Sequence, residues 1–263
     1  MSENTRSDES TAPMRVQADA SGRVALVTGA SRGLGAAMAE ALAADGWHVV
    51  ALARTTGALE ELDDRIQARG GQATLAPMDV TQDDAMRHLC RSIHDRWGRL
   101  DLWVHAAVHA PPLSPAGHIA AKDWGRTLDI TLRATGLLIP LIEPLLRASP
   151  QGTALFFDDT ARFDDSGAAR KFFGAYSAAK AGQMALVAAW AAECAALGPG
   201  RAPRVLIDRP APMPTATRAR FFPGEDRGAL TAPATEAARL MATLNACPAP
   251  ACRALRPGRW IRA

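Results

Sequence analysis

The 263-residue chain is poor in tyrosine, lysine and cysteine, of which it contains one, three and four residues. The cysteines form no Cys-x-x-Cys pair and have no histidines at zinc-ligand spacing, so neither a disulfide framework nor a metal site is predicted. They suit the reducing cytoplasm, where we expect the protein to reside. No uncharged run of eighteen apolar residues occurs, and the sequence therefore predicts no membrane-spanning helix.

Charges of both signs are scattered along the chain rather than grouped. Lys and Arg number 30 against 27 Asp and Glu, and no basic stripe suited to nucleic acid is present. Residues 1–21 are polar, lack the apolar core of a secretory signal and contain acidic residues that transit peptides avoid. We predict a disordered tail over 1–21 and a single domain over 22–263.

Short β-branched or leucine-rich runs alternate with longer helical patterns after Gly22, which is typical of repeated βαβ units on a parallel sheet. Pro140 and Pro144 are expected to kink or break the long helix that begins near residue 121. We predict an α/β fold with one doubly wound parallel sheet of about seven strands and helices on both faces. The strands are expected at 23–28, 48–53, 72–80, 100–108, about 153–158 and 203–208, with an edge strand in the tail at 256–263.

The segment TGASRGLG lies between the first expected strand and the first expected helix and places glycines at 29, 33 and 35. Glycines in such a turn let the backbone approach a pyrophosphate and aim the amides of the next helix at it. A plain strand-to-helix turn is the alternative. The motif opens a βαβ unit at the first strand, however, which is the context expected of a dinucleotide site.

The single tyrosine, Tyr176, stands four residues before Lys180 in the segment GAYSAAKA. This spacing is one turn of a helix, so both side chains lie on one face. A phenol with a pKa of about 10 is a weak acid–base catalyst at neutral pH, and a nearby ammonium lowers that pKa by favouring the phenolate. The pair therefore predicts a site in which Tyr176 gives a proton to a carbonyl oxygen. A partly buried tyrosine beside a surface lysine is the alternative.

The Gly-x-x-x-Gly-x-Gly turn and the Tyr-x-x-x-Lys pair together resemble the short-chain dehydrogenase/reductase family, over residues 22–245. The resemblance implies one Rossmann-type domain that binds a nicotinamide dinucleotide and transfers a hydride to or from a small carbonyl or alcohol substrate. It also implies a homodimer or homotetramer packed through the two long helices. The residues expected at the cofactor are Gly29, Ser31, Arg32, Gly33, Leu34, Gly35, Arg54, Asp79, Val80, Ala106, Lys180 and Pro210.

Charge at the end of the second expected strand indicates which dinucleotide binds. Where an Asp would accept a hydrogen bond from a ribose 2′-hydroxyl, the chain has Arg54, and Arg32 lies on the same side of the site. Two guanidinium groups suit a 2′-phosphate, so NADP(H) is preferred over NAD(H), with solvated surface arginines as the alternative. Asp79 and Val80 match the family's adenine contact, and Asp79 suits a helix N-cap equally well.

The family's serine, upstream of the tyrosine, has no counterpart at the end of the fifth expected strand. Asp159 or Thr160 falls in that position, and we prefer Thr160 because its hydroxyl can donate a hydrogen bond. An ionised Asp159 would oppose the phenolate, because two like charges about 4 Å apart repel by roughly 4 kcal/mol at an effective dielectric near 20. Ser166 is a weaker candidate for the same role.

Other positions also depart from the family. Ala106 and Val108 stand in the places of its Asn and Gly after the fourth strand, and Thr131 replaces the relay asparagine, whose backbone carbonyl holds a water near the lysine. Thr131 still has such a carbonyl. The nearby His105 and His109 are interpreted as polar residues at a strand end.

The sequence thus favours an NADP(H)-dependent oxidoreductase whose catalytic site contains Tyr176, Lys180, Thr160 and Thr131. The alternative is a non-catalytic dinucleotide-binding protein of the same fold. Loops at 109–118, 160–173 and 209–230 are expected to wall the substrate pocket, where Phe221 and Phe222 either form an apolar lid or pack on the domain surface.

Overall fold

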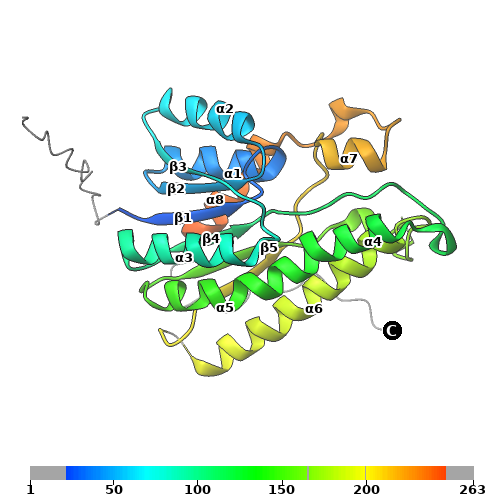
Figure 1. Ribbon diagram of the computed structural model, residues 1–263. Helices are drawn as coiled ribbons and strands as arrows, with labels where there is room; N and C mark the ends of the chain where they lie inside the picture. The colour runs from blue at the N-terminus through cyan, green and yellow to red at the C-terminus, as the bar shows by residue number, and fades with distance from the viewer. Residues whose placement is uncertain (1–21, 165, 199, 247–263) are drawn as a thin grey trace, which may run out of the picture.

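A parallel sheet forms the centre of the computed structural model, which describes residues 22–164, 166–198 and 200–246 (Figure 1). The strand order is β3-β2-β1-β4-β5-β6, and every pairing is parallel. Strands β1, β4 and β5 are buried along their whole length, which explains their nearly continuous apolar sequence. The strands are β1 Val24–Thr28, β2 His48–Ala53, β3 Gln72–Pro77, β4 Leu102–His105, β5 Thr153–Phe157 and β6 Arg204–Asp208.

The sheet grows outward from β1 in both directions. The chain adds β2 and β3 on one side and then returns to add β4, β5 and β6 on the other. Thr28 pairs with Leu52 of β2 and with His105 of β4, so the carboxyl ends of these three strands lie level. A crevice is expected at this edge, where the winding direction reverses.

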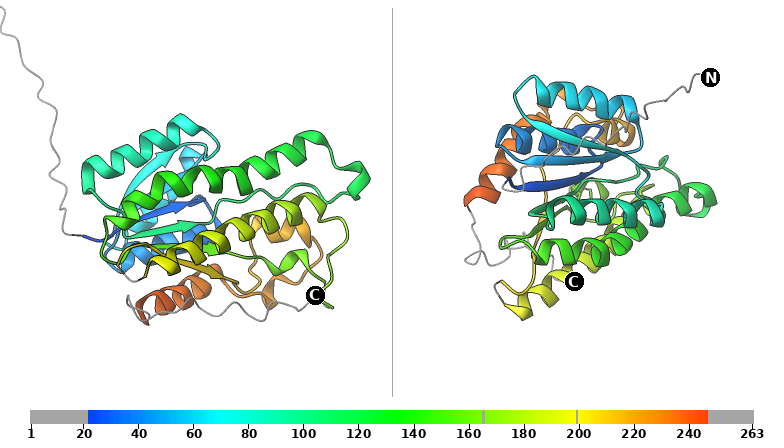
Figure 2. Two further views of the ribbon diagram at one scale, coloured as in Figure 1. Left: turned by 90° about the horizontal axis from the view of Figure 1, so that it is seen from below. Right: turned by 60° about the vertical axis from the view of Figure 1, so that its left-hand side comes forward.

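Helices cover both faces of the sheet (Figure 2). One apolar layer lies against α1 (Gly33–Ala44), α2 (Thr56–Gln67) and α8 (Pro233–Ala246). The other lies against α3 (Asp83–Trp97), α5 (Ala134–Arg147) and α6 (Gly174–Leu197). In the second layer Trp103 of β4 is fully buried and meets Phe156 edge-on, with ring centroids 4.9 Å apart. The helices that carry the glycine turn and the Tyr176–Lys180 pair therefore lie on opposite faces.

The long helix after residue 121 is irregular, but not at the prolines where a kink or break was predicted. Pro140 and Pro144 do not break it, since both lie inside α5 on its exposed side. There the carbonyls that lose a hydrogen bond can be solvated, and outward curvature is tolerated. The irregularity is instead a π-helical turn, Asp129–Arg133, between α4 (Ala121–Leu128) and α5.

Two other expectations need correction. The described part of the chain has six strands rather than about seven, and the edge strand expected at 256–263 lies outside the described residues, as does the tail at 1–21. The expected loop at 209–230 contains a short helix, α7 (Ala216–Phe221). Within the described residues, no helix combines the length and apolarity that a membrane span requires.

Candidate active site

A crevice opens at the carboxyl ends of the strands, beside the point where the sheet reverses direction. Its walls come from the turn after β1, the ends of β2, β4 and β5, the start of α6 and the segment after β6. Ligands of open α/β sheets bind at this place. Apart from Gly33, all the expected cofactor contacts line it: Gly29, Ser31, Arg32, Leu34, Gly35, Arg54, Asp79, Val80, Ala106, Lys180 and Pro210.

The turn between β1 and α1 requires glycine for both its backbone angles and its packing. Gly29 has φ +82° and Gly33 has φ +58°, angles that other residues rarely adopt. A Cβ on Gly35 would lie 2.2 Å from the carbonyl oxygen of Gly29. No side chain caps α1, whose N-cap residue Arg32 is extended, so the first amides of the helix are left for a ligand. These features fit the pyrophosphate of a dinucleotide.

Two arginines line the crevice, Arg54 directly after β2 and Arg32 in the turn before α1. The side chain of Arg54 is 47% exposed, and its Nη1 lies 3.9 Å from Asp79 Oδ2, too far for a hydrogen bond. Asp79 Oδ1 accepts hydrogen bonds from the amide and hydroxyl of Thr81 at 3.0 and 2.9 Å. Asp79 therefore fixes the turn before α3, whose N-cap is Gln82, and it lines the crevice as well. The guanidinium of Arg54 is left able to bind an anion, as is exposed Arg32.

Tyr176 lies in the first turn of α6 and lines the crevice, yet it is only 2% exposed. Its ring packs against Phe221 of α7, with centroids 4.8 Å apart, and against Phe173 at 6.4 Å. Phe221 is itself buried and covers the tyrosine ring. Phe222 instead lies beneath the guanidinium of Arg218, 4.6 Å from the ring centroid.

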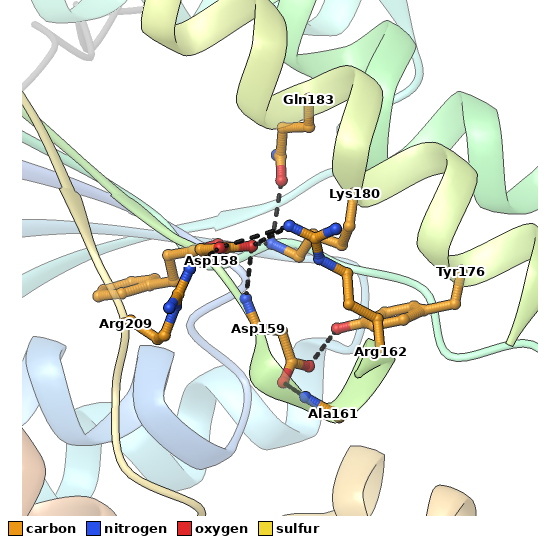
Figure 3. Close-up of polar contacts among 9 residues, drawn as sticks. Asp158, Asp159, Ala161, Arg162, Tyr176, Lys180, Gln183 and Arg209 are labelled. Atoms are coloured by element: carbon orange, nitrogen blue, oxygen red, sulfur yellow. Dashed lines mark hydrogen bonds and ion pairs between the residues drawn. The ribbon is translucent and has the colours of Figure 1, made fainter. Parts of the chain in front are cut away.

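Asp159 is the hydrogen-bond partner of the phenol. The Tyr176 hydroxyl donates to Asp159 Oδ2 at 2.5 Å (Figure 3). Asp159 Oδ1 accepts from the amide of Ala161 at 2.8 Å and so caps the short 3-10 turn Thr160–Arg162. The prediction that Thr160 fills the serine position is therefore corrected. The cap holds the Asp159 carboxylate against the phenol, whereas Thr160 is carried to an exposed place on the crevice wall.

The surroundings of Tyr176 favour its protonated form. Burial acts first, followed by the charge of Asp159, the hydrogen bond to it and the charge of Asp158, and together they raise the pKa of the phenol well above its ordinary value. Arg162 acts in the opposite direction. The expectation that a neighbouring ammonium makes this phenol more acidic therefore fails in this arrangement.

Lys180 uses two of its three ammonium protons inside the protein, and neither of them points to the phenol. Its amine donates to the carbonyl oxygen of Phe157 at 2.7 Å and to Gln183 Oε1 at 2.9 Å (Figure 3). Burial lowers the pKa of Lys180 to about 8, against the raising charges of Asp159 and Asp158. An ammonium has three protons, so one is left for a ligand in the crevice.

Beneath the Tyr176–Asp159 pair lies a buried ion-pair cluster that the sequence did not reveal. Asp158, only 3% exposed, contacts Arg209 at 2.9 Å and Arg162 at 3.2 Å. Burial opposes its ionisation, but the hydrogen bond from Arg209 and the charge of Arg162 hold the pKa of Asp158 below its ordinary value. Its Oδ1 also accepts from the amide of Asp159 at 2.9 Å. The available signal was an Asp directly after a mostly apolar strand, with an Arg four residues later.

A chain of buried polar groups continues behind Lys180. Gln183 Nε2 donates to Thr135 Oγ1 at 2.8 Å, and that hydroxyl donates to the carbonyl oxygen of Thr131 at 2.9 Å. The two nitrogens of fully buried His105 lie 3.1 Å from Thr135 Oγ1 and 2.7 Å from Thr28 Oγ1. Burial lowers the pKa of His105 to about 3, so the ring is neutral. The sequence signal was Gln183 one helical turn from Lys180 in an otherwise apolar helix.

The remaining residues expected at the site do not contact the Tyr176 hydroxyl. Thr131 is in the π-helical turn and does not line the crevice, while the side chain of Ala106 packs against the glycine turn, where a Cβ on Gly35 would lie 3.4 Å from it. Ser166 is exposed and its hydroxyl donates to Asp164 in a surface turn, away from the phenol. Among the described residues, no group of three His, Cys, Asp or Glu side chains is arranged to hold a metal ion.

Comparison with curated proteins relates the chain to one family. The family model for short chain dehydrogenase matches residues 23–223. The 3-oxoacyl-[acyl-carrier-protein] reductase of Synechocystis sp. is 32% identical over 179 residues, which are 67% of this chain and 70% of that one. Against four other curated reductases and dehydrogenases, the chain spans only 12%, 44%, 47% and 29% of their lengths.

Solved structures share the fold. A putative short chain dehydrogenase from Pseudomonas syringae matches with a TM-score of 0.72 and 30% identity, over 81% of this chain and 85% of that chain. A putative short chain dehydrogenase from Escherichia coli CFT073, complexed with NADPH, matches with a TM-score of 0.73 and 27% identity, over 84% and 89%. With its doubly wound sheet, its glycine turn and the match over 23–223, the chain belongs to the short-chain dehydrogenase/reductase family of oxidoreductases.

Proposed function

We propose that the protein is an NADP(H)-dependent oxidoreductase that interconverts a small carbonyl compound and its alcohol. The observation that carries the proposal is the meeting, in one crevice, of the uncapped glycine turn with Arg32, Arg54 after β2, and Tyr176 at the start of α6. The Escherichia coli neighbour, complexed with NADPH, supports the choice of cofactor.

Each group has a role in this proposal. The bound nicotinamide supplies or accepts the hydride. The glycine turn and the first amides of α1 would hold the pyrophosphate, Arg32 and Arg54 the 2′-phosphate, and the third amine proton of Lys180 the ribose hydroxyls. Tyr176 exchanges a proton with the substrate oxygen. Phe221 of α7 covers the tyrosine ring. For the substrate oxygen to reach the phenol, α7 must therefore either shift or pack on the substrate.

A non-catalytic dinucleotide-binding protein is the second candidate, and two observations favour it. The Tyr176 hydroxyl is bonded to the Asp159 carboxylate, and its ring is covered by Phe221. A chain with this arrangement would keep the cofactor crevice and lose the reaction. The two candidates differ only in turnover, so one experiment separates them.

The deciding experiment combines an NADPH titration with a turnover assay. NADPH fluorescence is followed as the full-length protein is added, and NADPH consumption is then measured over a panel of aldehydes and ketones. Binding with consumption of at least one carbonyl compound is the expected result. Binding without consumption over the whole panel would favour the non-catalytic candidate, and a lack of NADPH binding would contradict both.

Arg54→Ala is expected to weaken NADPH binding by about 10- to 100-fold, the effect of losing a charge-assisted hydrogen bond to the 2′-phosphate. NADH lacks that phosphate, so its affinity should change by no more than a few-fold. Fluorescence titrations of both cofactors check the result. Arg69→Ala, which removes an exposed arginine paired with Glu40 beyond α2, is the matched control. Equal losses for NADPH and NADH would mean that Arg54 does not recognise the phosphate.

Assembly and location belong to the same proposal. A homodimer or homotetramer would pack through α5 and α6, as the family resemblance implies. The buried free thiols of Cys90 and Cys194 suit a reducing cytoplasm. Cys247 and Cys252 lie outside the described residues.

A further inference from the structure

The contact between Tyr176 and Asp159 indicates where the proton of the reaction goes, and this inference rests on the function proposed above. We propose that Asp159 accepts the proton that leaves the Tyr176 hydroxyl and exchanges it with solvent in the crevice, so that the proton path runs away from Lys180. Asp159 thereby takes part in the reaction through Tyr176 rather than merely repelling its phenolate.

The direction of the hydrogen bond is the first argument. The Tyr176 hydroxyl donates to Asp159 Oδ2 at 2.5 Å, within the range of short bonds between a hydroxyl and a carboxylate. With its pKa raised, the phenol is protonated at rest. A protonated phenol accepts a proton from an alcohol only if its own proton leaves at the same time. Asp159 Oδ2 is the atom toward which that proton already points.

Contact with solvent distinguishes Asp159 from the neighbouring carboxylate. Asp159 is partly exposed on the crevice wall, with its other oxygen fixed by the amide of Ala161. Asp158 is almost completely buried and is neutralised by Arg162 and Arg209. Figure 3 shows the two carboxylates on opposite sides of the backbone, with only Asp159 reaching the phenol. A proton on Asp159 can therefore reach water, whereas Asp158 stays ionised.

The hydrogen-bonded chain behind Lys180 does not carry a proton past the side-chain amide of Gln183. Lys180 donates to Gln183 Oε1, and Gln183 Nε2 donates onward to Thr135. A side-chain amide has separate acceptor and donor atoms and does not readily hand a proton across. The Thr131 carbonyl accepts a hydrogen bond from the Thr135 hydroxyl. Neutral His105 continues the chain as a buried hydrogen-bonding group and does not take up a proton near neutral pH.

The proposed step balances in both directions. In alcohol oxidation the substrate O–H bond breaks and its proton joins the Tyr176 oxygen, while the phenol O–H bond breaks and its proton joins Asp159 Oδ2. The electron pair of the C–H bond leaves the carbinol carbon as hydride, for which the oxidised nicotinamide dinucleotide is the acceptor. In carbonyl reduction the same protons move in reverse, so that oxidation requires Asp159 as carboxylate and reduction requires it as carboxylic acid.

Alcohol oxidation releases a proton to the crevice, and carbonyl reduction takes one up. The charged and titratable groups that face the pair come from the turn after β5, the start of α6 and the segment after β6: Asp158, Asp159, Arg162, Tyr176, Lys180 and Arg209. Deprotonation of Lys180, whose pKa is about 8, would change both directions together through binding.

The decisive variant is Asp159→Ser, which restores the family's hydroxyl in place of the carboxylate. If Asp159 accepts the proton, Asp159→Ser and Asp159→Asn lower kcat of alcohol oxidation by about 100-fold or more, the usual contribution of a positioned proton acceptor, and Asp159→Glu retains part of the activity. If the carboxylate only opposes the phenolate, Asp159→Ser raises the rate instead. Asp95→Asn, an exposed carboxylate in the last turns of α3, is the matched control and should leave kcat unchanged.

Tyr176 also provides a readout that needs no cofactor, because it is the only tyrosine in the chain. In protein labelled with ¹³Cζ-tyrosine, NMR titration reports the pKa of this phenol without assignment. We expect the wild-type phenol to titrate above its ordinary value of 10.0 and the phenol of the Asp159→Ser and Asp159→Asn variants to titrate at a lower pH than that of the wild type. Asp95→Asn should match the wild type.

The outcomes distinguish this inference from the function on which it rests. A raised or unchanged oxidation rate in Asp159→Ser overturns the proton route while leaving an oxidoreductase. If the pKa of the phenol in Asp159→Asn equals that of the wild type, the contact between Tyr176 and Asp159 is absent, and this result also overturns the proton route. If the wild type and Asp159→Ser both bind NADPH and neither shows turnover, the proposed function fails, and the proton route fails with it.

Discussion

Tyr176→Phe is expected to lower turnover by about two to four orders of magnitude, the usual contribution of a positioned proton donor. NADPH affinity should change by no more than a few-fold. Phenylalanine keeps the ring that packs against Phe221 and Phe173, so the fold and the crevice wall remain. What is lost is the hydroxyl that exchanges a proton with the substrate oxygen. Initial rates of NADPH consumption and the NADPH fluorescence titration measure the two effects separately.

The binding measurement is the internal control for this variant. Lost turnover with intact NADPH binding assigns the loss to the hydroxyl, whereas loss of both would indicate a damaged crevice. Because Asp159 is partly exposed, water can replace the phenol as its hydrogen-bond donor, and unfolding is not expected. Retained activity in Tyr176→Phe would refute the role assigned to the tyrosine.

Asp158→Ala is expected to lower the free energy of unfolding by about 3–5 kcal/mol, because it leaves a buried guanidinium without its carboxylate. The side chain of Arg162 is only 10% exposed and contacts Asp158 at 3.2 Å. Half-exposed Arg209 can turn to solvent, so most of the effect comes from Arg162. Thermal unfolding should show a midpoint lower by roughly 10 °C for a chain of this size.

Two comparisons make this prediction specific. Asp84→Ala removes an exposed carboxylate 3.9 Å from Arg87 on α3 and should cost less than about 1 kcal/mol. A similar cost for both variants would contradict the importance of the buried cluster.

The pH dependence gives the second comparison. With a folded pKa below the ordinary 3.8, Asp158 stabilises the protein above about pH 4, and this contribution is lost as the pH falls through the folded pKa. Asp158→Asn should lack that acid-dependent loss.

The fold and the cofactor side of the site were predictable because they depend on local patterns. Alternating apolar runs place strands, and the strand expected at 48–53 coincides with β2. The glycines at 29 and 35 are required by backbone angles and contacts within one turn, so the sequence of that turn is enough to predict it. The strand order follows from the way βαβ units pack, and the crevice follows from the strand order.

The catalytic side was less predictable because it depends on contacts between distant segments. Asp159 and Thr160 are neighbours in sequence, and the 3-10 turn decides which of them meets Tyr176. The pKa of Tyr176 depends on its burial, to which Phe221 contributes from a helix that the sequence pattern did not reveal. Lys180 is one helical turn from Tyr176, yet its amine turns to Phe157 and Gln183, and helical spacing does not specify that choice.

The most direct test of the proposed function follows the hydride. NADPH with both hydrogens at the nicotinamide C4 replaced by deuterium is mixed with the protein and a carbonyl compound that it consumes, and the product is examined by mass spectrometry and NMR. We predict one deuterium on the carbinol carbon of the alcohol and an equal amount of oxidised cofactor, with both lost in Tyr176→Phe. Cofactor oxidation without deuterium in the product, or undiminished transfer in Tyr176→Phe, would contradict the proposed function.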